Sequence, residues 1–447
     1  MSGSTLIIIA MASIFVLLFL VIRTKLHAFV SLLLVSLLVG IAAGMPFGKV
    51  LESIESGMGG TLGFIAVVVG LGAMFGRMLE VSGGAERLAQ TMIRKFGEDR
   101  AQWALGITGF IVAIPVFFDV GFIILVPIIY GLAKKTGKSL LYYGIPLLAG
   151  LAVTHSFIPP TPGPIAVAKL IDAELGWVIL FGTIAGIPAM ILGGPLFGKY
   201  IAKKIDAAVP EYMNVEEKKY NRALPSFGLI ATLILIPLIL ILLNTVSGVI
   251  LPDSSILKSF FTFLGHPFVA LTIATLLAFI FLGIRRGYTR QEVQEIATKS
   301  LEPAGIIILV TGAGGVFKQV LMDSGVGDVL GEMMAGSNLP PVLLAFLIAT
   351  VVRVSQGSAT VAMVTAAGLL SPLIDTLGLE GPVLGLIVIA IAAGSTVFSH
   401  VNDSGFWLVN RYFGLDVKDT LKSWTMMETI VGFVGFAVVF LLSLIIT

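Results

Sequence analysis

The chain has 447 residues, of which 57% are hydrophobic and 12% charged, about half the charged share of an ordinary soluble domain. Its mean hydropathy is +1.03, and its formal net charge of +2 offers no basic excess for nucleic acid. The absence of cysteine excludes disulfides, thiolate metal sites and cysteine nucleophiles. This composition excludes an ordinary soluble protein and indicates an all-α polytopic membrane protein embedded in a lipid bilayer.

Apolar runs of about 20 residues, long enough to cross a bilayer, predict simple membrane spans along the whole chain. The first run has no basic residue before it and no small-residue cleavage site after it, so we expect a retained helix and not a signal peptide. The predicted spans lie near 5–22, 26–45, 61–79, 176–198, 226–247, 266–284, 303–321 and 426–446.

Two further apolar regions bend in the middle and predict re-entrant helical hairpins. Residues 101–133 turn at a proline-rich tip that carries Asp119. Residues 342–374 turn at a polar tip that runs from Arg353 to Thr360. Each region is therefore expected to form two short helices that meet at a tip inside the membrane.

Two other regions begin as helices and are then interrupted. Residues 139–168 are broken after His155 by a cluster of prolines, and residues 383–409 are broken by the polar segment 399–405. Irregular backbone at mid-membrane is tolerated only where it is buried in protein or lines a water-filled cavity. We therefore expect a polar cavity where the two breaks meet the two hairpin tips.

The sequence also repeats itself. Small and apolar residues from Gly63 to Leu88 recur at constant spacing from Gly305 to Leu330, and further downstream His155 pairs with His400. Duplication predicts a first unit at 1–200, a cytoplasmic linker at 201–225 and a second unit at 226–447. Each unit would hold three spans, a surface segment (84–96 in the first), a hairpin, a broken span and a last span.

Five crossings per unit is an odd number, so the second unit is expected to be inverted relative to the first. The positive-inside rule supports this topology: nearly all loop Lys and Arg residues then share the linker's side, and Lys49, Lys169 and Lys258 fall on the other. The linker is expected to be cytoplasmic and both termini external. Inverted repeats with interrupted helices are typical of secondary transporters, and no GxxxxGK[ST] motif is present to bind ATP.

Several strings resemble the gluconate:proton symporter (gluconate permease) family over essentially the whole chain. They are Gly-Gly-Thr-Leu-Gly at 59–63, Val-Thr-His-Ser-Phe-Ile-Pro-Pro-Thr-Pro-Gly-Pro at 153–164, Gln-Gly-Ser-Ala-Thr-Val-Ala at 356–362 and Ser-His-Val-Asn-Asp-Ser-Gly-Phe-Trp at 399–407. The resemblance implies import of gluconate or a related sugar acid (an aldonate) by proton symport across the bacterial inner membrane, with no cofactor.

The chain departs from this family's pattern at two positions. Thr161 stands where gluconate members usually have His, and Asp119 stands where they usually have Glu. These departures point to a branch that carries another sugar acid. More distantly, the layout resembles the dicarboxylate and citrate carriers, which implies a homodimer with an elevator-type moving domain.

Candidate substrate-binding residues lie at the hairpin tips and helix breaks, because a sugar acid offers one carboxylate and many hydroxyls to bind. An arginine fork fits a carboxylate bidentately, so Arg353 is the candidate for the acid group, unless it neutralises a buried acid or extends to the interface. The polar side chains would bind substrate hydroxyls or only backbone. The candidates are Asp119, His155, Ser156, Thr161, Arg353, Ser355, Gln356, Ser358, Thr360, Asn402 and Ser404.

The candidates for proton coupling are Asp119, Asp403, His155 and His400. An intramembrane carboxylate is costly and usually functional, but Asp119 also fits a helix cap and Asp403 fits a turn. An imidazole can relay protons, or it can hydrogen-bond carbonyls freed by the helix breaks. These alternatives remain open from sequence.

Two rival functions are a sodium-coupled carboxylate transporter and, more remotely, an intramembrane enzyme. Hydroxyl-rich tips also suit Na⁺, whereas carboxylates and histidines at the breaks favour protons. Neither an HExxH nor a GxSxG motif occurs, so we expect a transporter and not an enzyme.

Overall fold

The computed structural model describes the chain except residues 1–2, 211–222, 327–328, 330–338 and 447, and all regular structure in the described part is helical. Eight stretches in this part are long and apolar enough to cross a membrane, and α2, α16 and α18 are apolar but shorter. The prediction of an all-α polytopic membrane protein is therefore confirmed.

The first half of the chain follows the predicted element order. After the spans comes the surface helix α4, at the predicted residues, and then a hairpin, a broken helix and a last span that continues through a π-helical turn. The elements are α1 (Gly3–Ile22), α2 (Ala28–Ala42), α3 (Phe47–Val81), α4 (Gly84–Phe96), α5 (Ala101–Val112), α6 (Phe118–Thr136), α7 (Leu140–Phe157), α8 (Pro162–Leu170), α9 (Leu175–Ile191) and α10 (Phe197–Ile201).

The second half shows the same order, with an additional short helix α12 after its first span. The counterpart of α4 lies largely outside the described residues. The elements are α11 (Phe227–Ile250), α12 (Ile256–Leu264), α13 (Pro267–Ala278), α14 (Arg290–Asp323), α16 (Pro341–Gln356), α17 (Ala359–Thr376), α18 (Pro382–Gly394), α19 (Ser404–Phe413), α20 (Val417–Thr420), the π-helical turn Leu421–Thr425 and α21 (Met426–Ile446).

Three helical stretches begin well before the apolar runs that predicted them. Helix α3 begins at Phe47 and not near 61, α14 begins at Arg290 and not near 303, and the last span begins at Val417 and not near 426. The added segments carry Lys, Glu, Gln and Arg. These residues lower the mean hydropathy but form helices well, so the apolar runs are shorter than the helices that contain them.

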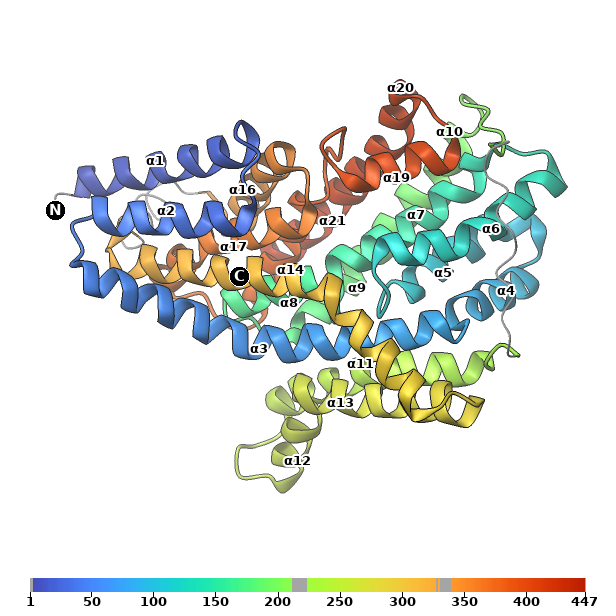
Figure 1. Ribbon diagram of the computed structural model, residues 1–447, viewed down its shortest axis with the longest axis horizontal. Helices are drawn as coiled ribbons and strands as arrows, with labels where there is room; N and C mark the ends of the chain where they lie inside the picture. The colour runs from blue at the N-terminus through green and yellow to red at the C-terminus, as the bar shows by residue number, and fades with distance from the viewer. Residues whose placement is uncertain (1–2, 211–222, 327–328, 330–338, 447) are drawn as a thin grey trace.

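Helices α3 and α14 pack along one another in opposite directions through small residues (Figure 1). A Cβ atom on Gly57 would lie 2.7 Å from the carbonyl oxygen of Gly315, so the backbones touch there. Toward the other end of the crossing, Gly70 lies against Leu301. Small residues let membrane helices approach this closely because packing, and not hydrophobic burial, holds helices together in lipid.

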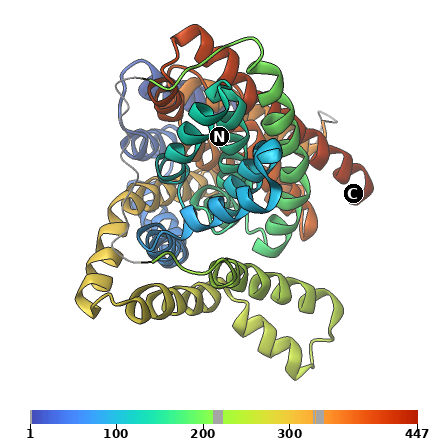
Figure 2. The ribbon, with the colours of Figure 1, turned by 90° about the vertical axis from the view of Figure 1, so that its right-hand side faces the viewer.

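Helices α11, α12 and α13 form a layer along one side of the molecule, visible in two perpendicular views (Figures 1 and 2). Their outer side chains are apolar, with Leu235 48% and Ile239 49% exposed. On the other side of α3 and α14, the two hairpins and the two broken helices pack into the body that contains the candidate site.

Candidate functional site

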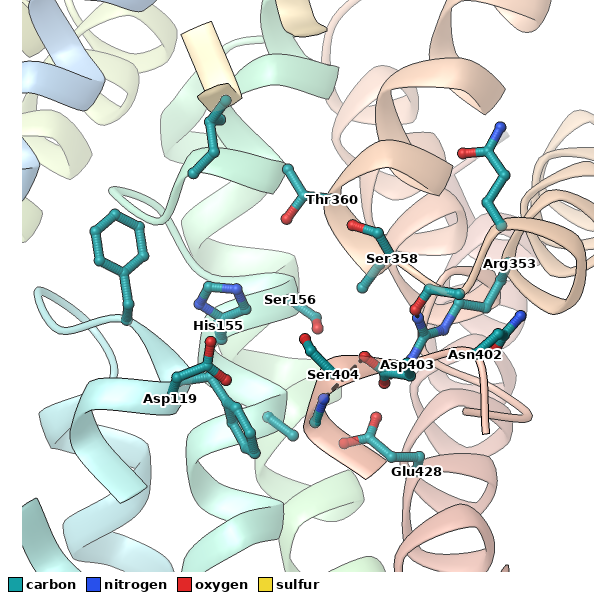
Figure 3. Close-up of a pocket in the computed structure, with 18 of the residues that line it drawn as sticks. Asp119, His155, Ser156, Arg353, Ser358, Thr360, Asn402, Asp403, Ser404 and Glu428 are labelled. Carbon is teal, nitrogen blue, oxygen red and sulfur yellow. Dashed lines mark hydrogen bonds and ion pairs between the residues drawn. The ribbon is translucent and has the colours of Figure 1, made fainter. Parts of the chain in front are cut away.

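A cavity of about 520 Å³ lies where the two hairpin tips meet the two helix breaks (Figure 3). The start of α6 and the end of α7 line one wall. The tip between α16 and α17 and the start of α19 line the facing wall. Its volume lies in the range of small-molecule sites in proteins. The four interrupted elements thus converge as the sequence predicted.

The second hairpin turns at Gly357, which has a backbone φ of 83°. This left-handed conformation ends α16, and Ser358 then begins α17, where its Oγ accepts a hydrogen bond from the Val361 amide at 3.4 Å. A Cβ at position 357 would lie 2.2 Å from the carbonyl oxygen of Asn402. Glycine is therefore required both by the turn and by the contact of the tip with the second helix break.

Arg353 at this tip forms an ion pair inside the protein. Its Nη2 donates to Oδ2 of Asp403 at 2.6 Å, and its Nη1 donates to the carbonyl oxygen of Gly357. The Arg353 side chain is 3% exposed and that of Asp403 is 12% exposed. Of the alternatives open from sequence, this geometry matches an arginine that neutralises a buried acid.

Asp403 is fully engaged by its neighbours. Its Oδ2 also accepts from Ser399 Oγ, which in turn accepts from Trp424 Nε1 at 2.7 Å. Its Oδ1 accepts from the Gly405 amide at 3.1 Å, so Asp403 caps α19. The turn role left open from sequence is therefore present, together with the ion pair.

The wall from the first half of the chain is less constrained. The side chains of Asp119, His155 and Ser156 line the cavity and make no hydrogen bond to any described residue. Asp119 is in the first turn of α6, where no side chain caps the free amides, and this position suits a negative charge. The rings of Phe117 and His155 meet edge to face, with their centroids 6.4 Å apart.

Polar groups available to a ligand surround the cavity. The hydroxyls of Thr360 and Ser404 have no partner in the described part of the chain. The side-chain amide of Gln356 and Oδ1 of Asn402 are buried without a hydrogen bond there. Buried polar atoms without partners are rare in folded proteins, so these groups suit a hydroxylated ligand.

Three predicted residues do not line the cavity, so the predicted roles of Thr161 and Ser355 in substrate binding and of His400 in proton coupling stay predictions. Thr161 lies beside a separate small cavity, and its Oγ1 donates to the Ile158 carbonyl at 2.6 Å. Ser355 points back along α16 and donates to the Val351 carbonyl at 2.8 Å. Nε2 of His400 lies 3.1 Å from the carbonyl oxygen of Val354. Each of these side chains lies within hydrogen-bond distance of a backbone carbonyl near a helix end, which is the alternative to ligand contact that the sequence left open.

Several residues that line the cavity were not among the candidates from sequence, and four of them lie outside the hairpin tips and helix breaks: Pro303 and Ile307 on α14, Trp424, and Glu428 on α21. Glu428 is 4% exposed, and its interruption of an apolar run was a signal that we did not use. The cavity therefore has three carboxylates, at Asp119, Asp403 and Glu428, and one guanidinium.

Comparison with known proteins identifies the family. A family model described as GntP family permease matches residues 4–445. The low-affinity gluconate transporter of Escherichia coli strain K12 is 45% identical over 435 residues, which cover 97% of either chain. The Gnt-II system L-idonate transporter of the same organism is 42% identical and covers 96% of this chain and 97% of its own.

A solved structure shares the fold. The crystal structure of the YdaH transporter of Alcanivorax borkumensis superposes with a TM-score of 0.65 at 15% sequence identity, covering 92% of this chain and 96% of the other. The relatives are named as transporters and permeases, and the chain shares its fold with this solved structure. From the family match and these identities, the chain belongs to the GntP family of permeases.

Proposed function

We propose that this permease is a secondary active transporter that imports gluconate or a related sugar acid by proton symport across the bacterial inner membrane. The observation that carries this proposal is the cavity between hairpin tips and helix breaks, which combines free hydroxyls and amides with an excess of carboxylates. Relatives named for gluconate and L-idonate transport support the substrate class.

The cavity suits an aldonate chemically. Such a substrate has a chain of hydroxyls, each both donor and acceptor, and the cavity offers matching partners at Ser156, Thr360, Asn402 and Ser404. The uncapped amides at the start of α6 offer donors to the acid group. Arg353 contributes positive potential, and its buried Nε has no partner in the described part of the chain.

The charges explain why an anion would travel with protons. Arg353 is paired with Asp403, so among the described residues no cation is hydrogen-bonded to Asp119 or Glu428. An anionic substrate beside two ionised carboxylates would be repelled, because like charges in a low-dielectric site interact strongly. Protonation of these carboxylates removes the repulsion. Substrate and proton binding thus favour each other.

We also propose the architecture expected from sequence: two inverted units, 1–200 and 226–447, around the linker 201–225, in an elevator-type homodimer with both termini external. The antiparallel packing of α3 and α14 supports the inversion, since repeat-related helices of inverted units run in opposite directions.

The test is transport in proteoliposomes, with Asp119→Asn as the informative variant. A pH gradient without sodium should drive labelled gluconate into wild-type vesicles. Asn resembles the protonated acid and cannot titrate, so Asp119→Asn should accumulate less substrate in a pH gradient than the wild type. It should keep exchange of labelled for unlabelled substrate, which needs no net proton movement. Asp119→Glu should keep both activities.

Two outcomes would contradict the proposal. Wild-type accumulation that requires sodium and ignores the pH gradient would refute proton symport. Accumulation by Asp119→Asn that is driven by the pH gradient and reaches the wild-type level would remove Asp119 from the coupling step.

A further inference from the structure

Glu428 lies on α21, deep in the wall of the cavity. Its side chain is 4% exposed, and in the described part of the chain its carboxylate receives no hydrogen bond. In Figure 3 it lies below Asp403, on the far side of the cavity from Asp119. A carboxylate this buried must have a cation, a set of donors or a proton to offset the loss of hydration.

The described residues around Glu428 do not supply a cation that lacks a partner. Arg353 on α16 is the positive neighbour of Glu428 and is already paired with Asp403 at the start of α19. Asp403 itself is a further negative neighbour. From the other elements around the cavity, α6 brings Asp119 and α7 brings His155. An ionised Glu428 would therefore face one shared cation and two other acids.

Asp119 and Glu428 differ in their exposure to the cavity. Water in the cavity can hydrate the exposed Asp119, whereas Glu428, in the cavity wall, is largely enclosed by protein. The enclosed acid has little hydration to offset its charge, so a substrate anion that enters the cavity strongly favours its protonated form. Both acids lack a hydrogen-bonded partner in the described residues, so each has room for one coupled proton.

We propose that Glu428 is a second proton-binding residue of the transport site, so that two protons, one on Glu428 and one on Asp119, accompany each sugar-acid anion. This inference rests on the proposed function. One monoanion with two protons moves one net positive charge inward per cycle, and one monoanion with one proton moves none. Removal of a single titrating carboxylate should therefore turn an electrogenic transporter into an electroneutral one.

The experiment uses the full chain in proteoliposomes, with labelled gluconate as probe and a potassium diffusion potential set by valinomycin. An inside-negative potential should drive accumulation in the wild type, about tenfold for each 59 mV if one net charge moves. Glu428→Gln should abolish the response to potential and keep accumulation driven by a pH gradient. The matched control is Glu80→Gln, which changes a buried Glu that is paired with Arg77 on α3, away from the cavity; it should respond to potential like the wild type.

The outcomes separate this inference from the proposed function. A Glu428→Gln protein that still accumulates gluconate in response to potential overturns the role of Glu428 and leaves proton symport standing. Wild-type uptake that responds to pH but not to potential overturns the two-proton stoichiometry alone. Uptake that ignores both gradients overturns the proposed function. If Glu428→Gln does not fold, the reversal potential of wild-type transport gives the number of protons per gluconate. A ratio of one proton per gluconate contradicts the proposal.

Discussion

The buried pair of Arg353 and Asp403 makes a quantitative prediction about stability. Replacing Arg353 by Met leaves Asp403, which is 12% exposed, without its cation, and also removes the donor to the Gly357 carbonyl. Breaking one side of a buried ion pair costs about 3–5 kcal/mol. Asp403→Asn keeps one oxygen to cap α19 and removes the charge together with one acceptor oxygen, so the double variant should recover part of the loss.

The assay is a double-mutant cycle on the free energy of unfolding, measured by denaturant titration of the protein in mixed micelles. We expect the effects of Arg353→Met and Asp403→Asn to be non-additive by about 0.5–3 kcal/mol, as for other residues in direct contact. The same cycle on the exposed pair of Lys135 and Glu98, whose side chains are 65% and 50% exposed, should give no measurable coupling. If the two substitutions change the free energy of unfolding additively, the ion pair between Arg353 and Asp403 does not stabilise the contact of the second hairpin with the second helix break.

Three further predictions test other parts of the site. Gly357→Ala should prevent correct folding, because its Cβ would clash with the Asn402 carbonyl oxygen. Gly378 has a φ of 60°, and a Cβ added there would have no neighbouring atom within 4 Å, so Gly378→Ala should cost only about 1–2 kcal/mol of backbone strain. Fluorescence-detected size exclusion would distinguish the two variants. Ser156→Ala should raise the apparent KM for gluconate about two- to tenfold through one lost hydrogen bond, while Thr161→Val, outside the cavity, should leave it unchanged. A reporter fused after Lys204 should report a cytoplasmic position and one at the C-terminus an external position, and a cytoplasmic C-terminus would contradict the five-crossing unit.

The helices and their interruptions were predictable because the physical signals are local. Apolar runs of spanning length mark most helices, and prolines after Phe157 or the polar tip at Gly357 mark the ends of others. Backbone that cannot stay helical in lipid must be gathered in protein, which is why the convergence of tips and breaks on one cavity also followed from sequence.

The partners inside the cavity were not predictable, because they depend on packing between distant segments. Arg353 is paired with Asp403, fifty positions away in sequence, and nothing local to either residue distinguishes an ion pair from a substrate contact. Glu428 was overlooked for a related reason. The apolar run near 426–446 places Glu428 at the end of a span. In the structure, the π-helical turn Leu421–Thr425 continues the helix back to Val417, so Glu428 lies inside a 30-residue span.

The side chains on the two walls of the cavity differ in how they are held by hydrogen bonds. On the wall from the second half of the chain, a single chain of hydrogen bonds links Arg353, Asp403, Ser399 and Trp424. The opposite wall carries Asp119, His155 and Ser156 without such bonds among the described residues. Side chains fixed by hydrogen bonds (the rigid wall) hold any bound sugar acid in one position. Side chains without such bonds (the compliant wall) can adjust to the configuration of each hydroxyl-bearing carbon. Discrimination between stereoisomeric sugar acids should therefore be more easily altered by substitutions on the compliant wall, whereas substitutions on the rigid wall should reduce uptake of all of them together. Competition assays with a panel of aldonate epimers would measure this difference.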